Sequence, residues 1–236
     1  MTARLIVALD AGSKSGALAI VDALGEDCDF YKVGSELFTA VGPPIVEKLL
    51  ALGKDVFLDL KFHDIPATVR SAARSAASTG AKLITVHASG GRGMIEAAVE
   101  GAGSGCGVLG VTVLTSFTSG ELAEAWGRPF VDVVLEAKRL ASVTRSAGAR
   151  GVVCAGTEAR AIRNDFGSAF EILVPGLRLA GGENHDQARV VTPREAADNG
   201  ATYLLLGRTV TGRADTSAAI RQVRASLHHQ PLITDS

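Results

Sequence analysis

The feature that most constrains the fold of this chain is a repeated pattern. Eight times in succession, a short apolar stretch rich in β-branched residues precedes an Ala-rich amphipathic stretch. Short apolar runs are typical of buried strands, and small or apolar residues at i, i+3 and i+4 are typical of helices that pack along one side. Eight such units predict an α/β fold, a (β/α)8 TIM barrel. The strands are expected at residues 4–10, 30–34, 55–61, 82–88, 107–115, 151–155, 171–176 and 203–207.

Length and composition agree with one barrel. The 236 residues suit a single barrel domain over residues 1–228, followed by a polar C-terminal tail over residues 229–236. Hydrophobic residues make up 47% of the chain and aromatic residues only 5%, which predicts a core of Val, Ile, Leu and Ala, as in parallel sheets covered by helices. A doubly wound open sheet is the alternative. The first strand is not followed by the GxGxxG sequence of a dinucleotide-binding sheet, which favours the barrel.

Charge and cysteine usage exclude several classes of function. The formal net charge is −1 and no stretch concentrates Lys or Arg, so nothing favours nucleic-acid binding. No apolar run approaches the roughly 18 residues that a membrane span needs, and the N-terminus lacks a basic targeting segment. Cys28, Cys106 and Cys154 are widely separated and form no CxxC pair, which argues against disulfides and zinc. The sequence predicts a cytoplasmic protein with a small-molecule ligand.

Charged residues lie toward the ends of the first three predicted strands. Asp10 ends the first strand, Lys32 lies in the second, and Asp59 and Lys61 lie two positions apart in the third. Because strand side chains alternate, Asp59 and Lys61 are expected to point into the barrel while the leucines beside them face the helices. Polar residues at the carboxyl ends of barrel strands are typical of catalytic sites, and buried charges must be paired. We expect these four residues to converge in an active site, with a structural salt-bridge network as the alternative.

The longest segment without a strand or helix pattern is residues 178–191, which contains GGENH at 181–185. Long loops in compact domains are often functional, and this one follows the seventh strand, on the face where barrel enzymes bind ligands. We interpret it as a candidate lid. A plain solvated loop is the alternative.

Residues 59–68, with the sequence DLKFHDIPAT, resemble the DxKxxDIPxT signature of the orotidine 5′-monophosphate decarboxylase family. Ala67 departs from the family pattern, in which asparagine is expected to be common, and this departure puts no catalytic role in doubt. Shorter runs also fall where the family would place them, so the resemblance covers nearly the whole chain. They are IVALD at 6–10, YKVG at 31–34, TVHA at 85–88, VLTS at 113–116, PGLR at 175–178 and GR at 207–208.

The resemblance implies a metal- and cofactor-free decarboxylation of orotidine 5′-monophosphate to uridine 5′-monophosphate, the last step of de novo UMP biosynthesis. Lys61 would stabilise and then protonate the carbanion at C6 of the pyrimidine. Asp59 would flank that lysine on one side. On the other side would lie Asp64 of the partner subunit, because the family works as a homodimer in which Asp64, Ile65 and Thr68 reach into the partner's site.

The resemblance also implies a set of substrate-binding residues. Asp10 and Lys32 would bind the ribose hydroxyls, with Lys32 completing the catalytic charge network. Thr115 would lie near the pyrimidine ring. The phosphate site, which barrels commonly build after strands seven and eight, would consist of Arg178, Gln187, Gly207 and Arg208.

Two other functions compete with this interpretation. Related sugar-phosphate enzymes of the same barrel group share an Asp-x-Lys-like motif and use a divalent metal, held in part by an acidic residue where this chain has Lys32. A catalytically silent nucleotide-binding barrel is the second alternative, since fold alone does not establish function. His87 and His63 are interpreted as structural, orienting or dimer-contact residues, because no second histidine lies at metal-ligand spacing along the chain from His87.

Overall fold

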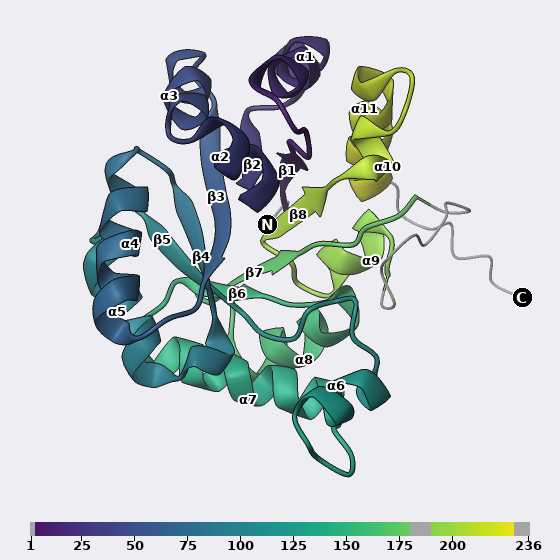
Figure 1. Cartoon of the computed structure of the whole chain (residues 1–236). Coiled ribbons are helices and arrows are strands. Elements are labelled where there is room, and N and C mark those ends of the chain that lie inside the picture. The colour runs from purple at the N-terminus through teal and green to yellow at the C-terminus, as the bar shows by residue number, and fades with distance from the viewer. Residues whose placement is uncertain (1–2, 180–189, 229–236) are drawn as a thin grey trace, which may run out of the picture.

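Eight parallel strands close into a barrel in the order β1 to β8 in the computed structural model, which describes residues 3–179 and 190–228 (Figure 1). The predicted (β/α)8 barrel is therefore confirmed. Residues 180–189, most of the candidate lid, lie outside the described residues, and so does the whole predicted C-terminal tail. The strands are β1 (Arg4–Ala8), β2 (Phe30–Gly34), β3 (Asp55–Phe62), β4 (Leu83–His87), β5 (Gly107–Val111), β6 (Gly151–Val153), β7 (Glu171–Val174) and β8 (Tyr203–Leu206).

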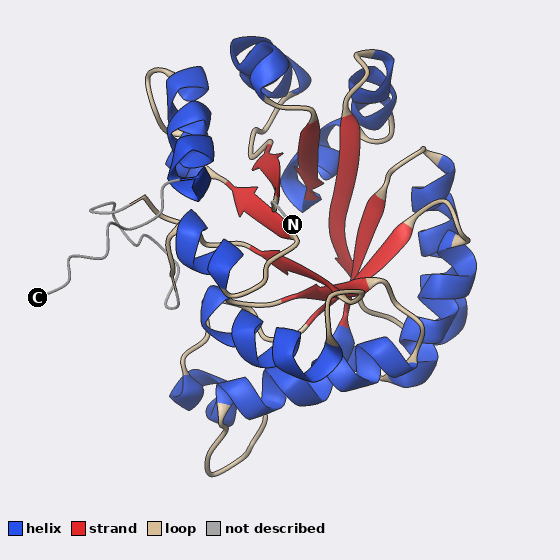
Figure 2. Cartoon of the chain, turned by 180° about the vertical axis from the view of Figure 1, so that it is seen from behind, coloured by secondary structure: helices blue, strands red, loops and turns tan. Residues whose placement is uncertain are grey.

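Helices cover the outside of the barrel (Figure 2). Several begin at residues that the sequence marks as helix starts: the Thr118 and Thr192 side chains form capping boxes, and Pro66 occupies a first turn. Within the described ranges, no helix has the length and apolar character needed to cross a membrane. The helices are α1 (Lys14–Leu24), α2 (Ser35–Val41), α3 (Pro44–Ala51), α4 (Pro66–Ser78), α5 (Arg92–Ala102), α6 (Ser119–Ala125), α7 (Val133–Ser146), α8 (Gly156–Phe166), α9 (Pro193–Asp198), α10 (Arg208–Thr211) and α11 (Thr216–His228), with 3-10 turns at Gly25–Asp27 and Ala88–Gly90.

Most strands end earlier at the carboxyl side than their sequence suggested. The largest difference is in β5, which was expected to run to residue 115 and ends at Val111. Its neighbour β6 is short, and the last pair between the two strands is Val111 with Val153. The Thr112 backbone N–H still donates to the Val153 carbonyl oxygen at 3.0 Å, and residues 113–116 then leave the sheet and line the cavity at the barrel mouth.

The core has two parts, separated by the barrel wall. Alternate strand residues point inward and fill the barrel: Ile6, Phe30, Phe57, Leu83, Leu109 and Leu173. The intervening residues pack against the helices in a larger cluster. Leu58 belongs to this outer cluster and Leu60 packs against it, as strand alternation predicted. The three cysteines are buried and free.

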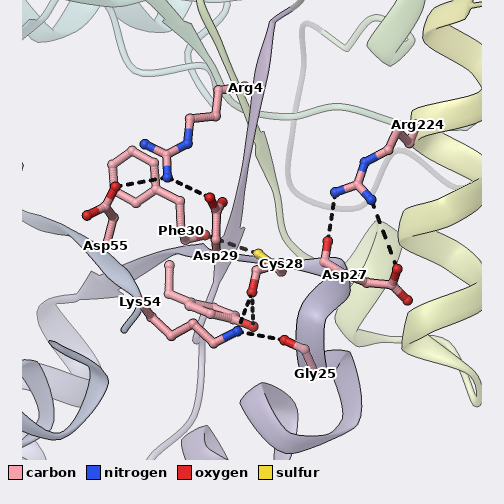
Figure 3. Close-up of polar contacts among 10 residues, drawn as sticks. Arg4, Gly25, Asp27, Cys28, Asp29, Phe30, Lys54, Asp55 and Arg224 are labelled. Carbon is pink, nitrogen blue, oxygen red and sulfur yellow. Dashed lines mark hydrogen bonds and ion pairs between the residues drawn. The ribbon is translucent and has the colours of Figure 1, made fainter. Parts of the chain in front are cut away.

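Charged residues at the amino end of the barrel pair with one another (Figure 3). The Arg4 guanidinium bridges Asp29 at 3.0 Å and Asp55 at 2.9 Å, and it lies 4.5 Å from the ring centroid of Phe30. The Lys54 ammonium donates to the carbonyl oxygens of residues 25 and 28 at 2.6 and 2.9 Å. These contacts tie the starts of β1, β2 and β3 together. In barrels, residues at this end serve stability, whereas chemistry lies at the carboxyl end.

Candidate active site

A cavity of about 360 Å³ opens at the carboxyl ends of the strands. Its size falls in the usual range for small-molecule sites, about 300–1,000 Å³. Its lining comes from seven of the eight strands or the loops that follow them. The structure brings eight of the predicted site residues together in this lining: Asp10, Lys32, Asp59, Lys61, Thr115, Arg178, Gly207 and Arg208.

An ion pair from β3 forms one wall of the cavity. The Lys61 Nζ donates to Asp59 Oδ2 at 2.7 Å. Asp59 is buried, with 6% of its surface exposed, whereas about a third of the Lys61 side chain remains open to the cavity. Burial of the carboxylate excludes competing water, so the pair holds the ammonium at a defined place while leaving it accessible to a ligand.

The backbone at Lys61 departs from a regular strand. Lys61 has φ of 50°, the one positive value among the non-glycine residues in the described part of the chain. The register of β3 against β4 shifts between Leu58 and Phe62, as in a β-bulge. Strand alternation predicted that Lys61 and Asp59 lie on the same side of the strand, and the two side chains do meet. The lysine, however, reaches Asp59 from an irregular stretch of strand. Bulges of this kind often change the direction of side chains beside active sites.

Thr85, on the neighbouring strand β4, contacts both members of this pair. Its Oγ1 accepts from the Lys61 backbone N–H at 2.9 Å and donates to Asp59 Oδ1 at 2.8 Å. Sequence reasoning assigned this residue no role. The available signal was that Thr85 is polar and lies on the same side of the strand as the inward-pointing Leu83, two positions before it.

A second ion pair joins β2 to the end of β1. The Lys32 Nζ donates to Asp10 Oδ1 at 2.8 Å; the lysine side chain is mostly buried, and the aspartate side chain is about half exposed. A Cβ added at Gly34 would lie 2.9 Å from the Lys32 Nζ, so the glycine leaves the space that the ammonium occupies. The four charged residues thus converge as two ion pairs, and the two charges within each pair neutralise one another.

Two arginines line the cavity from the segments that follow β7 and β8. The Arg178 Nη1 donates to the carbonyl oxygen of Leu177 at 2.8 Å, and the backbone N–H of Arg178 donates to Val191 at 3.0 Å. Arg208 follows Gly207 at the end of β8, and both line the cavity. Guanidinium groups facing a cavity suit an anionic ligand such as a phosphate. Gln187, predicted in the same site, lies outside the described residues.

The predicted dimer residues lie apart from this cavity in the single chain. Asp64, Ile65 and Thr68 are exposed, and none of them belongs to the cavity lining. The Asp64 Oδ1 accepts from the backbone N–H of Ile65 at 2.6 Å, and the Ile65 side chain is 66% exposed despite being apolar. Their predicted role in a partner's site remains a prediction.

Two histidines that are far apart in sequence meet at the carboxyl ends of β3 and β4. The rings of His63 and His87 lie 5.4 Å apart between centroids, at 37°. Burial lowers the pKa of His87, and the neighbouring His63 and Lys61 act in the same direction. The spacing of the histidines in the sequence did not predict this pair, because they meet only when the chain between β3 and β4 returns and the two strands lie side by side. Among residues 3–179 and 190–228, no group of three or more His, Cys, Asp or Glu side chains is arranged to hold a metal ion.

Fold and cavity together define a class: a (β/α)8-barrel enzyme whose site, at the carboxyl ends of the strands, holds two lysine–aspartate ion pairs and two arginines. The profile of the "Orotidine 5′-phosphate decarboxylase / HUMPS family" matches residues 3–223 of this chain. The chain therefore belongs to that family.

Relatives and solved structures agree with this assignment. The orotidine 5′-phosphate decarboxylase of Laribacter hongkongensis is 48% identical over 227 residues, which cover 94% of this chain and 92% of the relative. The enzyme of the same name from Anaeromyxobacter sp. is 46% identical and covers 95% of this chain and 98% of its own length. A crystal structure of orotidine 5′-phosphate decarboxylase from Lactobacillus acidophilus superposes with a TM-score of 0.85 at 33% identity, covering 96% of this chain and all of the other.

Proposed function

We propose that this protein decarboxylates orotidine 5′-monophosphate to uridine 5′-monophosphate, the last step of UMP biosynthesis. The observation that carries the proposal is near full-length identity of 42–48% to enzymes named for this reaction, combined with the Asp59–Lys61 pair at the cavity wall. The family description joins two names, and the relatives from Laribacter hongkongensis, Heliobacterium modesticaldum and Anaeromyxobacter sp. carry the first.

Lys61 is the group that we place next to C6 of the pyrimidine. Loss of CO2 breaks the bond between C6 and the carboxyl carbon and leaves the electron pair on C6, where the ring cannot delocalise it as an ordinary enolate. A fixed ammonium beside that atom stabilises the charge because it is oriented before the reaction begins. Lys61 then gives a proton from Nζ to C6, and Asp59 keeps the lysine charged and in position beforehand. We propose that these steps need neither a metal nor a cofactor.

The remaining predicted site residues bind the substrate in this proposal. Asp10 and Lys32 hydrogen-bond the ribose hydroxyls, and Thr115 lies against the pyrimidine. Arg178, Gln187 and the Gly207–Arg208 turn bind the phosphate. Binding energy gathered at the phosphate, remote from C6, then orients the base against Lys61. Arg178, Gly207 and Arg208 line the cavity from the segments that follow β7 and β8, whereas Lys61 lines it from β3, and this supports the division.

We also propose that two chains share each site in a homodimer, with Asp64 of the partner subunit beside Lys61. The exposure of Asp64 and of the apolar Ile65 supports a contact with another chain. Ile65 and Thr68 would enter the partner's site with it. We propose a cytoplasmic location as well, because the proposed reaction consumes a small soluble nucleotide.

A spectrophotometric assay tests the reaction directly. Purified protein should deplete the ultraviolet absorbance of orotidine 5′-monophosphate and should do so equally with EDTA present. Loss of turnover in EDTA with recovery on adding Mg²⁺ would favour the metal-dependent sugar-phosphate alternative. An unchanged absorbance with well-folded protein would refute the proposal.

A further inference from the structure

The backbone of Lys61 adopts a conformation that needs external support. A non-glycine residue at φ of 50° is in the left-handed region, which L-residues occupy at a cost. The bulge that contains Lys61 also takes its peptide out of the regular ladder between β3 and β4. Such an N–H group within a sheet requires another acceptor, because an unpaired buried donor is unfavourable.

Thr85 supplies that acceptor from β4. Its side chain is fully buried, with 0% exposed, and its Oγ1 lies 2.9 Å from the Lys61 backbone nitrogen. A hydroxyl has one hydrogen to donate, and here the second contact, to Asp59 Oδ1 at 2.8 Å, uses it. The direction of both hydrogen bonds is therefore fixed, since the amide can only donate and the carboxylate can only accept.

Together these bonds close a ring around the catalytic pair. The Lys61 amide binds Thr85, Thr85 binds one oxygen of Asp59, and the other oxygen of Asp59 binds the Lys61 ammonium at 2.7 Å. A carboxylate held at only one oxygen can turn about its terminal bond. Because Thr85 holds the first oxygen, the second is directed at the ammonium.

We propose that Thr85 is a positioning residue for decarboxylation: one hydroxyl fixes both the bulged backbone of Lys61 and the rotation of Asp59. This inference rests on the proposed function. Thr85 does not belong to the cavity lining, so it acts through the other two residues rather than on the substrate. Misplacement of an ammonium beside a reacting carbon affects the chemical step more than ground-state binding.

The first test removes the hydroxyl with Thr85→Val, which keeps the β-branched shape. We expect kcat for orotidine 5′-monophosphate to fall by about 10- to 100-fold, the loss typical of a hydrogen bond to a charged group. The affinity for uridine 5′-monophosphate, measured by calorimetry, should change less than about twofold because the ribose and phosphate contacts remain. Thr144→Val is the matched control: Thr144 is equally buried, and its hydroxyl bonds only the Leu140 carbonyl within helix α7, at 2.8 Å.

A second pair of variants isolates the hydroxyl even if valine prevents folding. Thr85→Ser and Thr85→Ala both lack the methyl group and differ only in the oxygen. Serine should retain kcat within about threefold of the original enzyme, and alanine should show the loss expected for valine. Equal kcat for serine and alanine, or normal kcat in folded Thr85→Val, would overturn the role of Thr85. Absence of decarboxylation in the unmodified protein would instead refute the proposed function.

Discussion

Helix α5 contains two glycines at which replacement by alanine should change the stability of the protein in opposite directions. Gly101, in α5, faces the backbone of Arg70 in α4: an added Cβ would overlap the Arg70 carbonyl oxygen and lie 3.0 Å from its carbonyl carbon and 3.1 Å from its Cα. Carbon atoms in favourable contact lie about 3.5–4.0 Å apart, and the overlap with the oxygen is the most severe of the three, so the helices would have to separate by about 1 Å or more. Overpacking of this kind costs about 1–3 kcal/mol.

Gly101→Ala should therefore lower the free energy of unfolding by about 2 kcal/mol. For a chain of this size, that is a fall in Tm of about 4–8 °C, measured by circular dichroism together with urea denaturation. Gly93→Ala, in the first turn of the same helix, is the control, because a Cβ there meets nothing within 4 Å. It should raise stability by about 0.5 kcal/mol through reduced entropy of the unfolded chain. A Tm of Gly101→Ala equal to or above that of the unmodified protein would refute the packing argument.

Three further predictions concern the site and its surroundings. Arg208→Ala should weaken binding of uridine 5′-monophosphate by at least about tenfold, and unchanged affinity would show that the phosphate lies elsewhere. Lys61→Ala and Asp64→Ala should each be inactive yet partly regain turnover when mixed; no recovery despite proven subunit exchange would count against a shared site. Burial holds the pKa of His87 below its ordinary value of 6.5, so below that pH the unfolded chain binds more protons and stability falls. Thermal melts from pH 7.5 to 5.5 should show a smaller loss for His87→Asn, and an identical loss would exclude His87 as the cause.

The strand–helix alternation was enough to predict the barrel and all eight strands, because each unit carries its own local signal. Strand ends were harder to place. Residues 112–115, with the sequence TVLT, suit a strand by residue type, but the last pair between β5 and β6 is Val111 with Val153. Pairing with a neighbour is a tertiary property, so local sequence does not contain it.

Much the same holds for the candidate site. The positions of Asp10, Lys32, Asp59 and Lys61 in their strands were enough to predict that they line one cavity. The bulge at Lys61 and its bonds to Thr85 were not predictable, because they depend on a register shift between two strands. The role of Asp64 depended on family resemblance from the beginning, since strand alternation does not extend past the end of β3.

The central claim is that the Lys61 ammonium, held by Asp59, carries out the decarboxylation. Single-turnover measurement of orotidine 5′-monophosphate decay by Lys61→Ala, alongside its affinity for uridine 5′-monophosphate, tests this most directly. We expect the chemical step to be nearly abolished while the product nucleotide still binds. A decay rate close to that of the unmodified protein would contradict it.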